Sequence, residues 1–200
     1  MTTTFSELGV PQDLIDALGE QGIESPFAIQ TLAIGDAMAR RDVCGKAKTG
    51  SGKTLAFSLP AIAHTERNQD GKPTTLMLTP TRELANQITG VVEPLAKARQ
   101  LRAIAVYGGT NIDRQIETIN NGIDIIIATP GRLIDLIERK AMDVALVECV
   151  VVDEADRMAD MGFLPQVEWI LRHIQVKHQT MLFSATLDGA VDTVVKRHLT

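Results

Sequence analysis

The strongest constraint on the fold is a series of short apolar runs separated by segments with helical periodicity. The runs are rich in β-branched residues and cover residues 42–45, 75–79, 103–107, 124–128, 149–153 and 180–184. Continuous apolar runs are typical of parallel strands that are covered on both faces. Between them, apolar residues recur at helical spacing, as at Leu84, Ile88, Val91, Val92 and Leu95. The alternation predicts an α/β fold with a mostly parallel, twisted sheet and helices on both faces.

Length and composition indicate one ordinary globular domain. The chain has 200 residues, of which 44% are apolar, enough for a sizeable core. No apolar run is long enough to span a bilayer and no signal peptide is visible, so we expect a cytoplasmic protein without membrane contact. Cys44 and Cys149 each lie in an apolar run, which predicts two buried thiols rather than a disulfide. Residues 66–74 are polar and predict a surface loop.

The charge balance limits how the chain could bind nucleic acid. Its formal net charge is −5 and only 4% of its residues are aromatic. These values argue against a protein that grips nucleic acid by bulk positive charge or on a broad stacking platform. Binding through a few well-placed hydrogen-bond donors remains open.

The stretch GKAKTGSGKT, residues 45–54, is close to the phosphate-binding pattern G-x-x-x-x-G-K-[ST]. It follows an apolar run and precedes a plausible helix, and its glycines let backbone N–H groups face an anion. Lys53 would reach the β- and γ-phosphates of a nucleotide, and the Thr54 hydroxyl would bind Mg²⁺. Ala47 stands where the pattern has glycine, and it fits there if its φ is negative. The alternative is a Gly/Ser surface turn.

A second candidate element is CVVVDEADRM, residues 149–158. Its apolar residues would place Asp153 at the carboxyl end of a strand, where ligands collect in open α/β sheets. Asp153 is then suited to hold Mg²⁺ through water, and Glu154 to orient or deprotonate an attacking water. By itself the acidic tetrapeptide could be a solvated turn. Its position after a buried strand and downstream of Gly-Lys-Thr favours a site that hydrolyses nucleotides, with Lys53, Asp153 and Glu154 as its catalytic residues.

These two elements resemble the DEAD-box RNA helicases of superfamily 2. Residues 153–156 spell the family signature DEAD, and the family's phosphate loop, A-x-T-G-x-G-K-T, matches the loop of this chain. Alanine at position 47 is therefore a family trait by resemblance. The resemblance implies an RecA-like domain that binds ATP and Mg²⁺. The implied ATP-binding loop residues are Ala47, Lys48, Thr49, Gly50, Ser51, Gly52, Lys53 and Thr54.

Further motifs of that family follow in order and cover almost the whole chain. GIESPFAIQ, residues 22–30, resembles the adenine-binding Q motif. In that motif Gln30 would pair with the adenine edge and Phe5 would stack on the base. The alternatives are a solvent-facing glutamine and a core phenylalanine. Ser25-Pro26 predicts an N-cap followed by the first residue of a helix. One departure is Phe27-Ala28, where the family usually has threonine and a variable residue.

Three more motifs resemble the RNA-contacting segments of the family. They are Pro80, Thr81 and Arg82 of PTREL, then Gly108 and Gly109, then Thr129, Pro130, Gly131 and Arg132 of TPGR. The first and the last follow apolar runs and open helices, where N–H groups, hydroxyls and arginine bind phosphate. Ordinary helix capping is the alternative role. Contacts to one RNA backbone need no basic face and give little sequence specificity.

The segment SAT, residues 184–186, resembles the motif that links hydrolysis to RNA handling. Ser184 and Thr186 flank Ala185, and their hydroxyls are expected to hydrogen-bond the carboxylates of the DEAD segment. Asp156 is the expected partner in particular. The alternative is a polar strand end without such a role.

The resemblance implies the ATP-binding half of an ATP-dependent RNA helicase. Residues 1–30 would form the Q-motif segment, packed on the ATP-binding domain of residues 31–200. A second RecA-like domain, with arginine fingers, is expected in a longer chain, so the isolated domain should be nearly inactive. RNA, as single strand or short duplex, is the implied partner. The alternatives are an ATP-gated RNA clamp that unwinds little, and an unrelated P-loop ATPase such as a DNA helicase.

Overall fold

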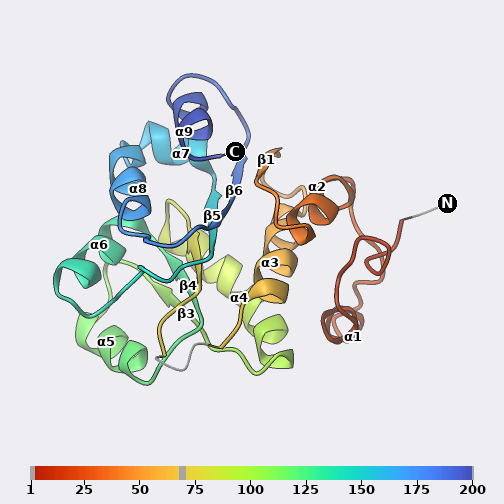
Figure 1. The fold of residues 1–200 in the computed structure, drawn as a ribbon, viewed down its shortest axis with the longest axis horizontal. Coiled ribbons are helices and arrows are strands. Elements are labelled where there is room, and N and C mark those ends of the chain that lie inside the picture. The colour runs from red at the N-terminus through yellow and green to blue at the C-terminus, as the bar shows by residue number, and fades with distance from the viewer. Residues whose placement is uncertain (1–2, 68–70, 200) are drawn as a thin grey trace.

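A computed structural model describes residues 3–67 and 71–199 of the chain. Within these residues one sheet of parallel strands has the order β1-β6-β5-β2-β4-β3 (Figure 1). Its strands are β1 (Val43–Lys46), β2 (Thr75–Leu78), β3 (Ala103–Val106), β4 (Ile125–Ala128), β5 (Cys149–Asp153) and β6 (Gln179–Ser184). The prediction of a mostly parallel α/β sheet is confirmed, and the six predicted strands are all present.

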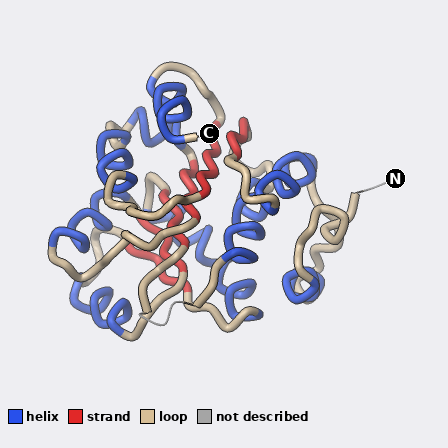
Figure 2. Tube along the Cα trace, in the orientation of Figure 1, coloured by secondary structure: helices blue, strands red, loops and turns tan. Residues whose placement is uncertain are grey.

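Helices follow the strands along the chain and cover both faces of the sheet (Figure 2). The first group is α1 (Gln12–Gly19), α2 (Ala28–Met38), α3 (Lys53–His64) and α4 (Arg82–Ala98). The second group is α5 (Ile112–Asn120), α6 (Pro130–Glu138), α7 (Ala155–Asp160), α8 (Leu164–Leu171) and α9 (Ala190–His198). No helix in the described part of the chain is long and apolar enough to cross a membrane.

Two hydrophobic cores, one on each face, hold the helices against the sheet. Alternate residues of a strand point to opposite faces, so Met77 joins the core under α1 to α4. Its neighbours Leu76 and Leu78 join the core under α5 to α9. The N-terminal segment belongs to the first core, because Phe5 and Leu14 are buried there. The predicted Q-motif segment is therefore packed on the same layer as α3 and α4.

The strand register brings the predicted site segments that follow strands to one edge of the sheet. Lys46 is level with Ser184, and Asp153 is level with Phe183. Leu78, Ala128 and Val106 at the ends of β2, β4 and β3 are likewise in register. Because all these strands are parallel, the segments that follow them lie at the same carboxyl edge, where ligands bind in such sheets.

The prediction that α2 begins at Ser25-Pro26 is wrong. The structure has Phe27 as the N-cap, with an extended backbone, and the helix begins at Ala28. The Phe27 N–H donates to Gln30 Oε1 at 2.9 Å. Gln30, the third residue of the helix, thus reaches back to the N–H of the N-cap residue, as the glutamine of a capping box does.

The prediction that both cysteines are buried is wrong for Cys44. Both thiols are free, but Cys44 is exposed while Cys149 is buried. The reason is strand order: β1 is an edge strand, and Val43 turns its side chain into the first core. Cys44 therefore points to the opposite side, and burial there is incomplete.

This difference gives a test of the strand order by thiol labelling. Burial raises the pKa of Cys149 to about 12, so its reactive thiolate is almost absent at pH 8. Burial also raises the pKa of Cys44, although its side chain remains accessible. We expect one thiol per native chain to react, slowly, with an aromatic disulfide reagent, and two in denaturant. The variant Cys44→Ser should show none in the native state; two reactive native thiols would contradict the placement of Cys149.

Candidate functional site

The predicted phosphate loop joins β1 to α3 with a left-handed turn at two glycines. Gly50 and Gly52 have φ of 84° and 85°, a region that other residues rarely adopt. Ala47 is not among the described residues with positive φ, so its methyl group is unstrained, and its N–H extends the sheet by donating to the Ser184 carbonyl at 2.8 Å. The Ser51 hydroxyl is buried and has no hydrogen-bond partner.

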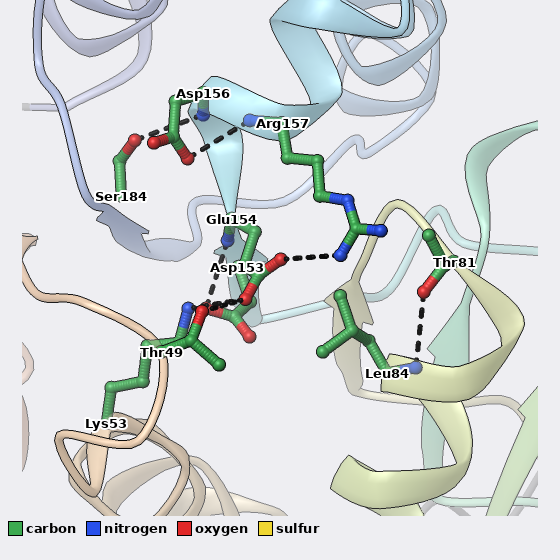
Figure 3. A network of polar contacts seen from close by, with 9 residues as sticks. All are labelled: Thr49, Lys53, Thr81, Leu84, Asp153, Glu154, Asp156, Arg157 and Ser184. Atoms are coloured by element: carbon green, nitrogen blue, oxygen red, sulfur yellow. Dashed lines mark hydrogen bonds and ion pairs between the residues drawn. The ribbon is translucent and has the colours of Figure 1, made fainter.

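At the mouth of this loop, the Lys53 ammonium lies between two carboxylates from the end of β5 (Figure 3). Its Nζ is 2.8 Å from Asp153 Oδ1 and 3.3 Å from Glu154 Oε1. All three side chains are buried. The Thr49 hydroxyl of the same loop donates to Glu154 Oε1 at 2.9 Å. The sequence-predicted catalytic residues are thus in direct contact, although they lie about a hundred residues apart along the chain.

The two carboxyl groups have opposite pKa shifts. Burial is the main influence on Asp153 and raises its pKa, against the opposing charge of Lys53. Burial also pushes the pKa of Glu154 upward, but the hydrogen bond from Thr49 and the charge of Lys53 outweigh it. The pKa of Glu154 is therefore held below its ordinary value. Glu154 is ionised at neutral pH, as a group that accepts a proton must be.

The backbone at Glu154 is strained. Its φ of 54° and ψ of 51° are left-handed, and such residues are rare and concentrated at functional sites. Glu154 is also the N-cap of α7, whose Arg157 returns one helical turn to place its NH1 atom 3.4 Å from Glu154 Oε2. Arg157 was not anticipated from the sequence, although it directly follows the DEAD segment. Together with Ala47, Thr49, Asp156 and Ala185, these residues line a small pocket of about 220 Å³.

The SAT segment, residues 184–186, contacts a backbone group at the start of α7. The Asp156 N–H donates to the Ser184 hydroxyl at 3.0 Å (Figure 3), whereas the sequence predicted the Asp156 carboxylate as the partner. The N–H groups of the first turn of a helix have no partner within it, so a nearby hydroxyl is well placed to accept from one. Thr186 is exposed, and Ala185 is half-buried between the two hydroxyls.

The Q-motif glutamine is attached to the phosphate loop. Gln30 is buried, and its Nε2 donates to the Gly52 carbonyl at 2.9 Å. Its Oε1 accepts from the Phe27 N–H. A carboxamide has two donor hydrogens and two acceptor sites, so one of each remains for the predicted adenine contact. Phe5 lies in the core at 2% exposure, and its stacking on a base stays a prediction.

The predicted RNA-contacting residues gather in a second pocket, of about 420 Å³, along the same edge. It is lined by Pro80, Arg82, Tyr107, Gly108, Thr129, Pro130, Gly131, Arg132, Asp135, Phe163 and Gln166. The Arg82 guanidinium lies over the Tyr107 ring, 5.1 Å from its centre. The Thr81 hydroxyl caps α4 by accepting from the Leu84 N–H at 3.3 Å (Figure 3), so the capping role considered for it is present. Thr81 and Gly109 are not among the residues that line this pocket.

Arg132 is held in place by contacts that the sequence does not indicate. Its NH1 donates to Gln115 Oε1 at 2.8 Å and to the Thr110 carbonyl at 3.3 Å. These partners come from the loop after β3 and from α5. A guanidinium has five N–H donors, so some remain for a ligand. Tyr107, Gln115, Phe163 and Gln166 are the lining or supporting residues that motif reasoning missed.

The loop and its surroundings fit a nucleoside triphosphate with Mg²⁺. The glycine turn and the start of α3 direct backbone N–H groups outward, the Ser51 hydroxyl has no partner, and Lys53 can exchange its carboxylate partners for phosphate oxygens. Thr54 and Asp153 offer oxygen atoms of the kind that Mg²⁺ prefers. No group of three or more histidine, cysteine or acidic side chains able to hold a metal occurs among the described residues.

Comparison with known proteins agrees with this site. The family model described as DEAD/DEAH box helicase matches residues 27–194. The chain is 43% identical over 202 residues to the pre-mRNA-processing ATP-dependent RNA helicase prp-5 of Neurospora crassa, covering 98% of this chain and 17% of that protein. It is 40% identical over 199 residues to RNA helicase CrhR of Synechocystis sp., covering 100% of this chain and 40% of CrhR. The chain thus spans less than half of these relatives.

The contacts of Lys53 predict a large effect on stability. The variant Lys53→Ala leaves the buried Asp153 carboxylate without its cation and Glu154 with Arg157 alone, and we expect a loss of about 3–5 kcal/mol in the free energy of unfolding at pH 7. The loss should shrink as the pH falls, because burial already raises the folded pKa of Asp153, the variant removes the charge that opposes this rise, and protonation removes the buried charge. Urea unfolding at pH 7 and pH 5 measures this. Lys48→Ala, which changes an exposed lysine of the same loop, is the control. Equal stability of Lys53→Ala and the unmodified chain at pH 7 would refute the ion cluster.

Proposed function

The chain belongs to the DEAD/DEAH box helicase family, and on that premise we propose that it is the ATP-binding domain of an ATP-dependent RNA helicase. The observation that carries the proposal is the contact of Lys53 with Asp153 and Glu154, beside a loop that turns at two glycines. The relatives named as ATP-dependent RNA helicases are all longer than this chain. The activity of the whole protein is therefore part of the proposal.

In the proposed reaction the loop binds the triphosphate, and Glu154 orients the attacking water and accepts its proton. Lys53 would leave the carboxylates and pair with the β- and γ-phosphates, because phosphate oxygens compete for the same ammonium. Glu154 is ionised at neutral pH, and Thr49 and Arg157 hold its two oxygens. It would accept a proton from the attacking water. Removing Lys53 from its vicinity would raise its pKa and make it a better base.

Mg²⁺ would be held by Thr54 and, partly through water, by Asp153. When bound, the ion would neutralise charge on the phosphates. The described residues supply few ligands at this point, which suits Mg²⁺ because it keeps several waters and binds phosphate oxygens directly. Asp153 is buried, so its carboxylate needs a cation beside it. Lys53 is that cation in the structure, and the ion would take its place when nucleotide is bound.

RNA would bind across the second pocket. Arg82 and Arg132 are both oriented by neighbouring side chains and both line it. The starts of α4 and α6 supply N–H groups for phosphates. Such contacts follow the RNA backbone, so we infer little sequence preference. They also explain how a chain with net charge −5 could bind RNA.

We infer that a second domain completes both sites. Arginine fingers in related phosphoryl-transfer sites are worth about 10³–10⁵ in rate, and the loop region here supplies one buried cation, Lys53. The domain alone would then bind nucleotide weakly and hydrolyse it very slowly. We also propose that residues 1–30 are packed on the ATP-binding domain as part of it. We further propose a cytosolic location, which the two free cysteines support.

Nucleotide binding by residues 1–200 tests the proposal directly. We expect calorimetry with Mg²⁺ to give a Kd of about 10 μM to 1 mM for ATP, equivalent to ~4–7 kcal/mol, because only one wall of the site is present. Lys53→Ala should abolish most of this binding, whereas Lys97→Ala, which changes an exposed lysine of α4, should retain it. Gln30→Ala should lower the preference for ATP over GTP. Equal binding of ATP and GTP by the unmodified chain would remove the adenine-reading role of Gln30, and no binding of either would remove the proposed function.

A further inference from the structure

Phe27 is the one phenylalanine whose ring is mostly exposed. All five phenylalanines lie in the described residues: Phe5, Phe57 and Phe183 are buried, Phe163 is half-buried, and Phe27 is 62% exposed. A single exposed apolar side chain needs no explanation by itself. The position of this ring, against the phosphate loop, is what distinguishes it.

Two hydrogen bonds and one close contact tie Phe27 to that loop. The Phe27 N–H donates to Gln30 Oε1, and Gln30 Nε2 donates to the Gly52 carbonyl, both at 2.9 Å. A methyl group added to Gly52 would lie 2.7 Å from Phe27 Cδ2. The ring therefore packs against the Cα atom of Gly52, one residue before Lys53, while more than half of its surface faces solvent.

We propose that the Phe27 ring packs against the base of the bound nucleotide. This inference rests on the proposed ATP site. Gln30, which is expected to bind the edge of the base, is hydrogen-bonded to the Phe27 backbone, so a base that reaches Gln30 also comes within reach of the ring. Phe5, the ring expected to stack, lies in the core at 2% exposure, whereas Phe27 is 62% exposed. The exposed Phe27 ring beside Gln30 is therefore accessible for a contact with the base.

The contribution of Phe27 differs in kind from that of Gln30. The carboxamide supplies donors and acceptors that distinguish one base from another. An aromatic ring contacts the flat face of a base, which every base has, so it adds affinity without selecting among bases. Threonine, which the family usually has at position 27, has no aromatic face. The proposed contact therefore depends on Phe27, where this chain departs from the family motif.

The test compares three ligands and two variants in titrations of residues 1–200. The ligands are the Mg²⁺ complexes of ATP, GTP and inorganic tripolyphosphate, which has no base. Phe27→Leu keeps an apolar side chain against Gly52 and removes the aromatic face. We expect this variant to bind ATP and GTP about 5- to 10-fold more weakly, or by ~1–1.4 kcal/mol, which is at the lower end of the contribution of one stacked base. Tripolyphosphate binding should not change.

Leu32→Ala is the matched control, because Leu32 is on the same helix and 77% exposed; it should bind all three ligands as the unmodified chain does. A second readout is the upfield shift of the adenine H2 and H8 resonances in the complex, which should be smaller with Phe27→Leu. If the unmodified chain binds ATP and Phe27→Leu binds it equally well, this inference alone is overturned. It is also overturned if Phe27→Leu weakens the binding of tripolyphosphate as much as the binding of ATP, since the ring would then only support the loop. Failure of the unmodified chain to bind ATP would instead remove the proposed site.

Discussion

The candidate site depends on one buried ammonium group between two buried carboxylates. Lys53 begins α3, Asp153 ends β5 and Glu154 directly follows it, so their contact joins the two motifs to which we assign the chemistry. Burying three charges costs several kcal/mol each unless they are paired and hydrogen-bonded. Thr49 and Arg157 supply the further hydrogen bonds to Glu154. A triphosphate would offer the same ammonium a second set of oxygen partners, and the proposed exchange would make the cluster a site as well as a structural ion pair.

The sheet brings this cluster and the second pocket to one edge. All strands are parallel and nearly in register, so each motif that follows a strand emerges beside the others. The phosphate loop follows β1, the two carboxylates end β5, and the residues around Arg82 and Arg132 follow β2 and β4. Ser184 at the end of β6 touches the start of α7. The proposed nucleotide and RNA sites thus share one edge of the sheet, and a second domain of the kind we propose could close over both.

Much of this arrangement could be predicted, because continuous apolar runs locate buried parallel strands and the motifs directly follow them. The strands, the helix after the loop, and the roles proposed for Lys53 and Glu154 came from local patterns of this kind. Strand order could not be predicted, and it is what leaves Cys44 exposed on an edge strand. Contacts between distant residues were also out of reach, such as Gln30 with Gly52 and Arg132 with Gln115. They depend on how packed helices bring side chains together, and no local pattern records that.

The central claim is that Glu154 accepts the proton in ATP hydrolysis while Lys53 holds the phosphates. The direct measurement is RNA-stimulated phosphate release by the longer protein that carries both domains, with Glu154→Gln beside the unmodified protein. Asp160→Asn, an exposed acid of the same helix, is the control. We expect a rate about 10²–10⁴ lower for Glu154→Gln, with ATP and RNA still bound and the control unaffected. Phosphate release by Glu154→Gln at the unmodified rate would contradict the account and move the catalytic role to another group.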